Sequence, residues 1–169
     1  MIQCRFTPAF IVKGNKMADW KDRLDEELET TRQQIQRYTV VLPQVAAQEF
    51  HRLRGMLESD AAVLTEKHGA RIGRIDVAKE EPNKIRIEKY DFPAYYVTLE
   101  LPSEAKQICV EREVRYSPSQ SRTFRTIFLE LDLDSRNNLL IRHDGKTLRL
   151  EEIAEMLLKP IVMGTDFER

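Results

Sequence analysis

Hydrophobic and small residues recur at helical spacing over the first third of the chain. Between residues 20 and 64 they take twelve steps across 44 residues, about 3.7 residues per step, which matches one face of an α-helix. We call this series the helical stripe, and it consists of Trp20, Leu24, Leu28, Thr31, Ile35, Tyr38, Leu42, Ala46, Phe50, Leu53, Leu57, Ala61 and Leu64. Five acidic residues lie near its start, between residues 22 and 29, and Gly69 follows its end. Both features are typical of helix termini, so we predict a helical segment over residues 17–69.

Pro43 interrupts this pattern. A proline inside a helix removes one backbone hydrogen bond and clashes with the preceding turn, at a cost of about 3 kcal/mol. An unbroken helix of about 50 residues would be about 75 Å long, whereas the other ~100 residues would form a globule with a radius of gyration of about 13 Å. We therefore expect the helical segment to be kinked or broken near Pro43. Even so, the stripe is longer than one small sheet can cover.

The hydrophobic period changes to two after Gly69. Apolar and polar residues alternate in six stretches, which short turns separate: RIGRIDVAKE, KIRIEKY, AYYVTLELP, QICVEREVRY, TFRTIFLELDLD and NLLIRH. Because no helical pattern intervenes, they predict an antiparallel meander sheet of five to six strands. HDGK supplies a hairpin turn, and LEEIAEMLLKPIV predicts a short C-terminal helix that ends at Pro160. The predicted fold class is α+β, with residues 70–169 folding as one unit with residues 17–69.

The first sixteen residues show no helical period and contain Pro8 and Gly14, whereas Met17 opens a natural helix start. We interpret residues 1–16 as an unstructured leader or a mis-annotated start. An additional strand formed by AFIV is the alternative.

Four arginines, Arg112, Arg115, Arg122 and Arg125, flank a turn in EREVRYSPSQSRTFR, residues 111–125. If the turn spans residues 117–121, opposed pairs have residue numbers that sum to 238. This register places Val114 opposite Phe124 and Glu113 opposite Arg125, a favourable cross-strand charge pair. It leaves Arg115 and Arg122 as the available cations, one on each face of the hairpin. We therefore interpret the hairpin as a solvated one, with a weak anion-binding site as the alternative.

Composition narrows the classes of function. The chain has 27 Lys and Arg against 28 Asp and Glu, a net charge of −1, which argues against a general binder of polyanions. Cys4 and Cys109 are interpreted as reduced thiols in a cytoplasmic protein. No apolar run approaches the ~18 residues needed to span a membrane.

Candidate catalytic and metal-binding groups are sparse. His51, His68 and His143 lack metal-ligand spacing. Three acids, Glu130, Asp132 and Asp134, share one face of a strand and are interpreted as its solvated side, with a divalent-cation site as the alternative. The sequence contains no glycine-rich phosphate loop, no G-x-S-x-G motif and no family signature. We predict no catalytic residue, metal or cofactor.

Three hypotheses of function follow. The first is a non-catalytic interaction protein that forms a homodimer, or binds another protein, through an interface of Trp20, Leu24, Leu28, Ile35, Tyr38, Phe50, Leu53 and Leu57. The second is binding of nucleic acid or a phospho-ligand through the arginine-rich hairpin, which is not favoured. The third is an enzyme with an unrecognised small-molecule pocket.

Overall fold

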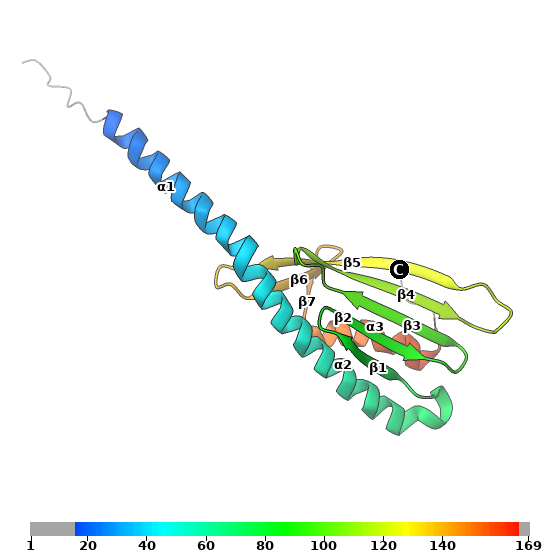
Figure 1. The fold of residues 1–169 in the computed structure, drawn as a ribbon. Helices are drawn as coiled ribbons and strands as arrows, with labels where there is room; N and C mark the ends of the chain where they lie inside the picture. The colour runs from blue at the N-terminus through cyan, green and yellow to red at the C-terminus, as the bar shows by residue number, and fades with distance from the viewer. Residues whose placement is uncertain (1–15, 166–169) are drawn as a thin grey trace, which may run out of the picture. The chain divides into compact units, whose positions relative to one another are not determined.

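The computed structural model describes residues 16–165, and the chain divides into two units, Met1–Gln36 and Arg37–Arg169. The interpretation of residues 1–16 therefore lies outside the described residues, apart from Lys16. The first unit consists of one described element, helix α1 (Lys16–Gln36) (Figure 1). Every residue from 20 to 36 is exposed.

The second unit begins with a π-helical turn, η1 (Arg37–Val41), followed by helix α2 (Leu42–Ile72). The interruption predicted near Pro43 is therefore a change of helical type. A proline ring clashes with the carbonyl four residues earlier, here that of Thr39, and cannot donate to it. The wider π-helical turn before the proline removes the need for that hydrogen bond.

Helix α2 ends later than predicted, at Ile72 rather than near Gly69. Gly73 closes it with φ of 83°, and its N–H donates to the Gly69 carbonyl at 2.8 Å. A Cβ at position 73 would lie 2.1 Å from the Asp91 carboxylate. Only glycine satisfies both the positive φ and this close approach.

The rest of the unit is a seven-stranded antiparallel sheet whose strands follow one another in sequence order. The strands are β1 (Asp76–Glu81), β2 (Lys84–Lys89), β3 (Ala94–Glu100), β4 (Gln107–Arg115), β5 (Thr123–Leu133), β6 (Leu139–His143) and β7 (Lys146–Leu148). The α+β class is confirmed, but the sheet has seven strands rather than five to six. The missed strand, β7, has only three residues, which is too short for an alternating pattern.

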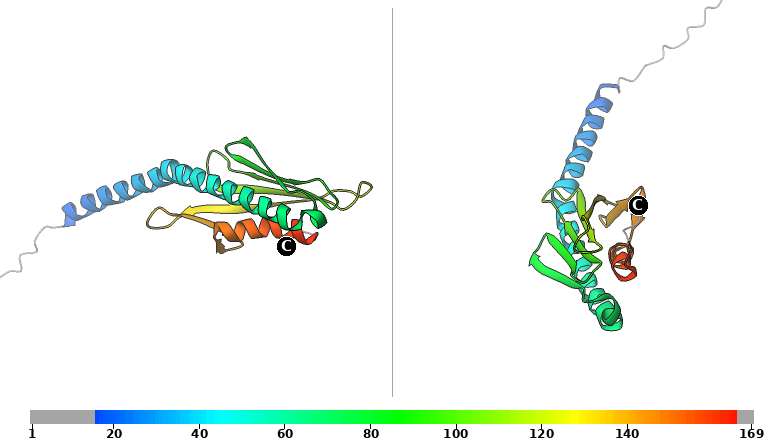
Figure 2. Two further views of the ribbon diagram at one scale, coloured as in Figure 1. Left: turned by 90° about the horizontal axis from the view of Figure 1, so that it is seen from below. Right: turned by 90° about the vertical axis from the view of Figure 1, so that its right-hand side faces the viewer.

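Helices α2 and α3 (Leu150–Met163) lie on one face of this sheet, which we call the inner face (Figure 2). The core between them includes Leu53 and Leu57 of α2 and Leu157 of α3, all 0% exposed. Pro160 was expected to end the C-terminal helix, but α3 continues to Met163 and ends at Gly164, which has φ of 68°. Pro160 removes one backbone hydrogen bond in the last turn of α3 but does not end the helix.

The register predicted for the hairpin of β4 and β5 is wrong by one residue. Opposed pairs sum to 237, so Arg112 lies opposite Arg125 and Glu113 opposite Phe124. The predicted register set Val114 opposite Phe124, but Val114 is buried on the inner face, whereas Phe124 and Phe128 point outward and are at least half exposed. Burial of the leucines later in β5 determines the phase of the strand, and a shift of one residue exchanges its two faces.

The first half of β5 forms an edge of the sheet. Strand β6 pairs with β5 only from Glu130 to Leu133. Among the residues that the structure describes, no strand pairs with residues 123–129 on the side opposite β4.

Candidate functional site

The helical stripe is exposed throughout α1. Trp20, Leu24, Leu28 and Ile35 are between 44% and 58% exposed. These side chains are spaced to form one face of the helix, and no residue of the described part of the first unit buries them. Exposed large apolar residues that cluster, rather than scatter, usually mark a surface for interaction.

The same stripe is buried in α2. Phe50, Leu53 and Leu57 are at most 2% exposed and belong to the core with α3 and the sheet. These three residues of the predicted interface therefore pack within their own unit and are not presented to a partner. The exposed members of the predicted interface are Trp20, Leu24, Leu28, Ile35 and Tyr38.

Tyr38 combines exposure with a polar anchor in its own unit. Its hydroxyl donates to Asp132 Oδ1 at 2.8 Å. This hydrogen bond is the main cause that lowers the pKa of Asp132 and raises the pKa of Tyr38. The neighbouring Arg37 donates to the Asn137 side chain at 2.9 Å and to the Asp134 carbonyl at 2.6 Å. Together these contacts attach η1 to the end of β5 and to the turn that follows it.

Arg115 and Arg122, the two arginines expected to be available, are engaged within the hairpin. Arg122 forms an ion pair with Glu113 at 3.0 Å. Arg115 donates to the Pro118 carbonyl, and its guanidinium lies 6.0 Å from the centre of the Phe92 ring. Neither arginine therefore forms the core of an anion site.

Arg112 and Arg125 instead lie side by side on the inner face, at directly opposed positions of β4 and β5. Arg112 is only 4% exposed and is flanked along its strand by Val110 and Val114. Burial, and then the charge of Arg125, lower the pKa of Arg112. A nearly buried guanidinium next to a second one is an unusual arrangement, because each charge disfavours the other.

These two arginines line a groove of about 790 Å³ that is open to solvent. One face of α3 forms a wall, with Glu152, Glu155, Met156, Lys159, Pro160 and Met163. The other lining residues are Arg112, Arg125, Thr126, Ile127, His143, Asp144, Lys146, Leu148 and Thr165. Sequence reasoning missed this groove because the predicted register placed Arg112 and Arg125 on opposite faces.

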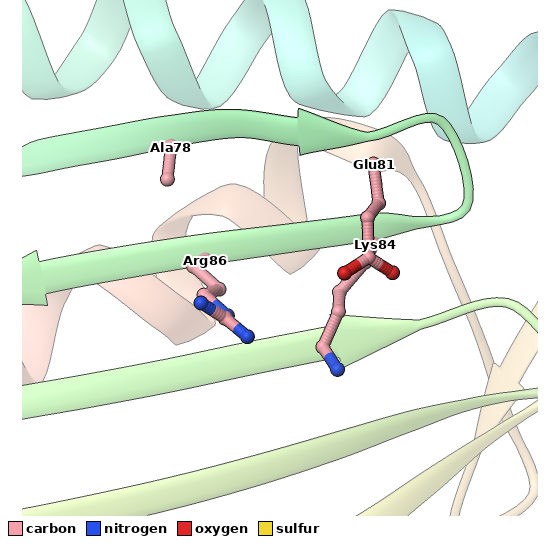
Figure 3. A pocket seen from close by; sticks show the side chains of 4 residues that line it. All are labelled: Ala78, Glu81, Lys84 and Arg86. Carbon is pink, nitrogen blue, oxygen red and sulfur yellow. The ribbon is translucent and has the colours of Figure 1, made fainter.

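A second hollow lies beside β1 and β2 and is lined by Ala78, Glu81, Lys84 and Arg86 (Figure 3). Its volume is about 10 Å³, which is the space of a single water molecule. It is too small to hold a substrate.

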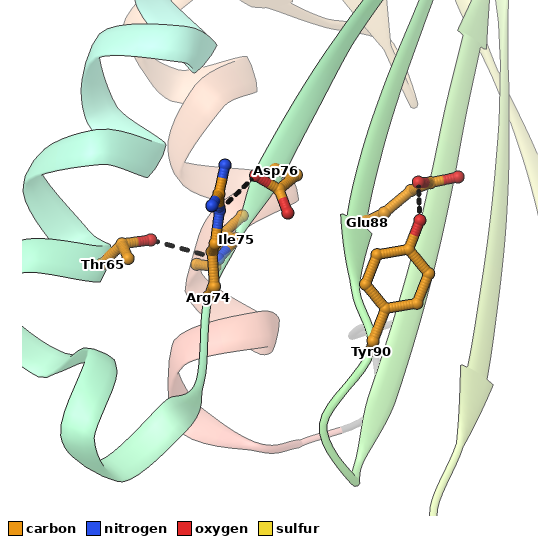
Figure 4. A network of polar contacts seen from close by, with 6 residues as sticks. All are labelled: Thr65, Arg74, Ile75, Asp76, Glu88 and Tyr90. Atoms are coloured by element: carbon orange, nitrogen blue, oxygen red, sulfur yellow. Dashed lines mark hydrogen bonds and ion pairs between the residues drawn. The ribbon is translucent and has the colours of Figure 1, made fainter.

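Polar contacts at the start of the sheet are structural (Figure 4). Thr65 of α2 accepts a hydrogen bond from the Ile75 N–H at 3.1 Å, and Arg74 pairs with Asp76 at 2.6 Å. The Tyr90 hydroxyl donates to Glu88, which raises the pKa of Tyr90. The first of these contacts joins the end of α2 to the chain leading into β1.

Within residues 16–165, no group of three or more His, Cys, Asp or Glu residues is arranged to hold a metal ion. Glu130 is exposed, Asp132 accepts the hydrogen bond from Tyr38, and Asp134 accepts the N–H groups of Arg136 and Asn138 in a turn. His143 Nε2 lies 3.5 Å from Asp144 Oδ2 at the turn between β6 and β7. Cys109 is half-buried on the outer face, and burial raises the pKa of its thiol.

Comparisons with protein-family models, curated protein sequences and solved structures give no match to this chain. None of the helices described here has the length and apolar character required to cross a membrane. The exposed stripe of α1 and the groove beside α3 are the two largest surface features described above.

Proposed function

We propose that this chain is a non-catalytic interaction protein that pairs with a second copy of itself through α1. The observation that carries the proposal is the exposure of Trp20, Leu24, Leu28 and Ile35 on one face of a 21-residue helix. The same pattern in α2 is covered by the protein's own core. A partner that covers the apolar face of α1 would explain why these large side chains are exposed in the single chain.

Burial of this face would be substantial. Each large apolar side chain contributes about 1.5–3 kcal/mol when it passes from full exposure to full burial. A helix of this length without tertiary packing is only marginally stable in water. Association of two α1 helices would therefore stabilise both the helices and the dimer.

The charges of α1 favour an antiparallel pair. Residues 19–29 contain six acidic and two basic residues, whereas Arg32 is the only charged residue from 30 to 36. Parallel helices would place two acidic halves side by side. Antiparallel helices place each acidic half beside the Arg32 half of its partner, and with Leu28 at the centre Asp25 of one copy faces Arg32 of the other.

Light scattering on the full chain over a range of concentrations tests the pairing. We expect a dimer that Leu28→Lys converts to a monomer. Gln33→Lys adds the same charge to the opposite face of α1 and should leave the dimer intact. A monomer at all concentrations, or equal effects of the two substitutions, would contradict self-pairing and leave a different protein as the partner of the stripe.

Cysteine cross-linking tests the orientation. In a background with Cys4→Ser and Cys109→Ser, a mixture of Asp25→Cys and Arg32→Cys chains should form a mixed disulfide dimer. Each variant alone should cross-link poorly. Efficient cross-linking of Asp25→Cys to itself would instead show a parallel pair.

The proposal places the protein in the cytoplasm. It is supported by Cys109, an unbridged and half-buried thiol within the described chain, which fits a reducing compartment.

A further inference from the structure

We propose that the outer face of the sheet binds the trimethylammonium group of a methylated lysine carried by another protein. The site is formed by the rings of Tyr90 and Tyr96 with the carboxylate of Glu88 beside them, and we call it the aromatic corner. It uses only residues of the second unit and does not depend on pairing through α1.

A row of outward-facing side chains places these groups together. The outer face is the one that neither α2 nor α3 covers (Figure 2). On it, Tyr96 of β3 lies directly opposite Glu88 of β2, and Glu88 lies opposite Asp76 of β1. The adjacent residues Ile87 and Tyr95 are 0% exposed in the core. Because side chains alternate along a strand, the row itself points to solvent.

Two tyrosine rings form the walls of the corner. The ring centres of Tyr90 and Tyr96 are 6.0 Å apart, and the ring planes meet at 76°. Tyr90 is 59% exposed, and its hydroxyl donates to Glu88, which holds the ring beside the row (Figure 4). The electron-rich face of an aromatic ring attracts a cation, and nearly perpendicular rings with a carboxylate nearby are suited to quaternary ammonium groups.

The carboxylates give the corner a negative potential. Like charges at directly opposed positions destabilise a sheet, and Asp76 is relieved by Arg74 at 2.6 Å. Glu88 accepts the Tyr90 hydroxyl and forms no ion pair with another residue of the described chain. Its hydrogen bond and its charge raise the pKa of Tyr90, and the charge of Asp76 adds to this effect. A cation near Glu88 is therefore favoured.

The basic side chains of this region lie elsewhere. The guanidinium of Arg115 is 6.0 Å from the centre of the Phe92 ring, which shows that an exposed ring here can hold a cation. Arg86 lines the small hollow beside β1 and β2. Over the range 16–165, no lysine or arginine lies over the Tyr90 or Tyr96 ring. The aromatic corner is thus accessible to a cation from outside the chain.

The shape of this surface favours a cation carried by a larger partner. Neither tyrosine lines the groove or the hollow described above, whereas sites for free small molecules usually enclose about 70–90% of the ligand. Phe124, 59% exposed, lies two strands beyond Tyr96 in the same row and offers an apolar contact to residues that flank the lysine. Methylation lowers the hydration of the ammonium, which favours the aromatic rings over water.

A purely structural role for the corner gives a different expectation. Perpendicular aromatic pairs stabilise a fold by their own contact. If this were the whole function of Tyr90 and Tyr96, their replacement would lower stability, and added cations would not bind.

NMR titration of the full chain separates the two roles, with the ring signals of Tyr90 and Tyr96 as the readout. The probes are tripeptides with leucine on either side of trimethyl-lysine, of lysine, or of the neutral analogue in which a tert-butyl group replaces the trimethylammonium. We expect trimethyl-lysine to bind at least about fivefold more tightly than either of the others. Equal binding of the neutral analogue or of lysine, or no binding at all, would overturn the proposal.

Choline supplies the same cation without a peptide. It should bind more weakly than the trimethyl-lysine tripeptide, because it lacks the contacts made by the flanking residues. Choline that binds as tightly as the tripeptide would overturn the assignment to a partner protein and identify a free small cation as the ligand.

Two acids of the same face provide the matched variants. Glu88→Gln should weaken binding of the trimethyl-lysine tripeptide at least about fivefold. Glu111→Gln removes an exposed acid of β4 whose cross-strand neighbours are threonines, and should leave the affinity within twofold. Tyr90→Leu should abolish binding, whereas Tyr90→Phe keeps the ring and should lose less. Equal losses for Glu88→Gln and Glu111→Gln, in variants that keep the wild-type circular dichroism, would overturn the site.

Discussion

The two halves of the helical stripe have different surroundings. In α2, small residues alternate with large ones, since Ala46 and Ala61 share the face with Phe50 and Leu53, and all four are at most 2% exposed. In α1 the large residues are exposed. Small residues allow a helix to approach a sheet closely, so the composition of the stripe, in addition to its period, distinguishes a helix face that packs internally from one that does not.

Polar anchors differ in the same way. Arg54 of α2 donates to the carbonyls of Glu81 and Lys84 in the turn between β1 and β2. The side-chain hydrogen bonds described for α1 join residues four apart in the same helix, as between Thr30 and the Glu26 carbonyl. These contacts fix α2 within its unit, whereas our proposal has α1 stabilised by association.

Hydrogen exchange should show the largest contrast. At concentrations below the dissociation constant of the proposed pair, amides of α1 should exchange by local opening at little cost. Amides of α2 should require global unfolding, at 5–15 kcal/mol, and so exchange about a thousandfold or more slowly. Raising the concentration should protect α1 selectively. Equal protection of both helices in the monomer would contradict the comparison.

Truncation of buried and exposed stripe residues gives the next largest contrast. Leu53→Ala removes a fully buried side chain, and we expect a loss of about 2–5 kcal/mol in the free energy of unfolding of the second unit. Leu28→Ala in α1 should change that free energy by less than about 0.5 kcal/mol. Urea unfolding followed by circular dichroism measures both. A similar loss for the two variants would show that α1 contributes to the same core.

Removal of the polar anchor of α2 should have a smaller effect. Arg54→Met keeps much of the apolar stem but loses two hydrogen bonds to carbonyls, and we expect a loss of about 1 kcal/mol. Arg52→Met is the control, because Arg52 is exposed and pairs only with Glu49 of its own helix among the contacts described. Urea unfolding midpoints that coincide for the two variants would contradict an anchoring role for Arg54.

Tyr38→Phe should have the smallest effect on stability. A titration of Asp132 is the most sensitive way to detect it. Loss of the hydroxyl donor should raise the pKa of Asp132 toward its ordinary value, as carboxyl carbon chemical shifts measure. The folded-state pKa of Asp132 is depressed, so its contribution to stability is present above the unfolded pKa of about 3.9 and is lost as pH falls through the folded value. The variant should therefore lose less stability than the wild type over this acidic range.

Tyr90→Phe is the matched control for this titration, because Tyr90 donates to Glu88 instead. It should leave the pKa of Asp132 unchanged. A shift of Asp132 in Tyr90→Phe, or none in Tyr38→Phe, would contradict the assigned hydrogen bond.

The sequence pattern was sufficient to predict the fold class, the helical segment and six of the strands. Period alone determined these, because Leu53 and Leu57 recur with the helix and the residues of β2 to β5 alternate. The pattern was not sufficient to predict the register of the hairpin of β4 and β5. Aromatic residues usually turn inward, but Phe124 and Phe128 lie on the outer face because the leucines that end β5 occupy the core.

The arginine groove was beyond prediction for the same reason. Arg112 and Arg125 are brought together only by the register, and the α3 wall that faces them comes from a segment about 30 residues later. The exposed part of the stripe was within reach. Its separation from the buried part does not follow from the period, which both halves obey, but from the composition of the stripe, in which Ala46 and Ala61 mark the packed half.

The edge formed by the first half of β5 has a consequence for the behaviour of the protein at high concentration. Residues 123–129, TFRTIFL, are rich in β-branched and aromatic side chains, and an edge with such a composition is a template for intermolecular strand addition and aggregation. Arg122 and Arg125 carry positive charges at this edge. Charged side chains at such an edge oppose strand addition, so replacing Arg122 and Arg125 by neutral residues should increase aggregation.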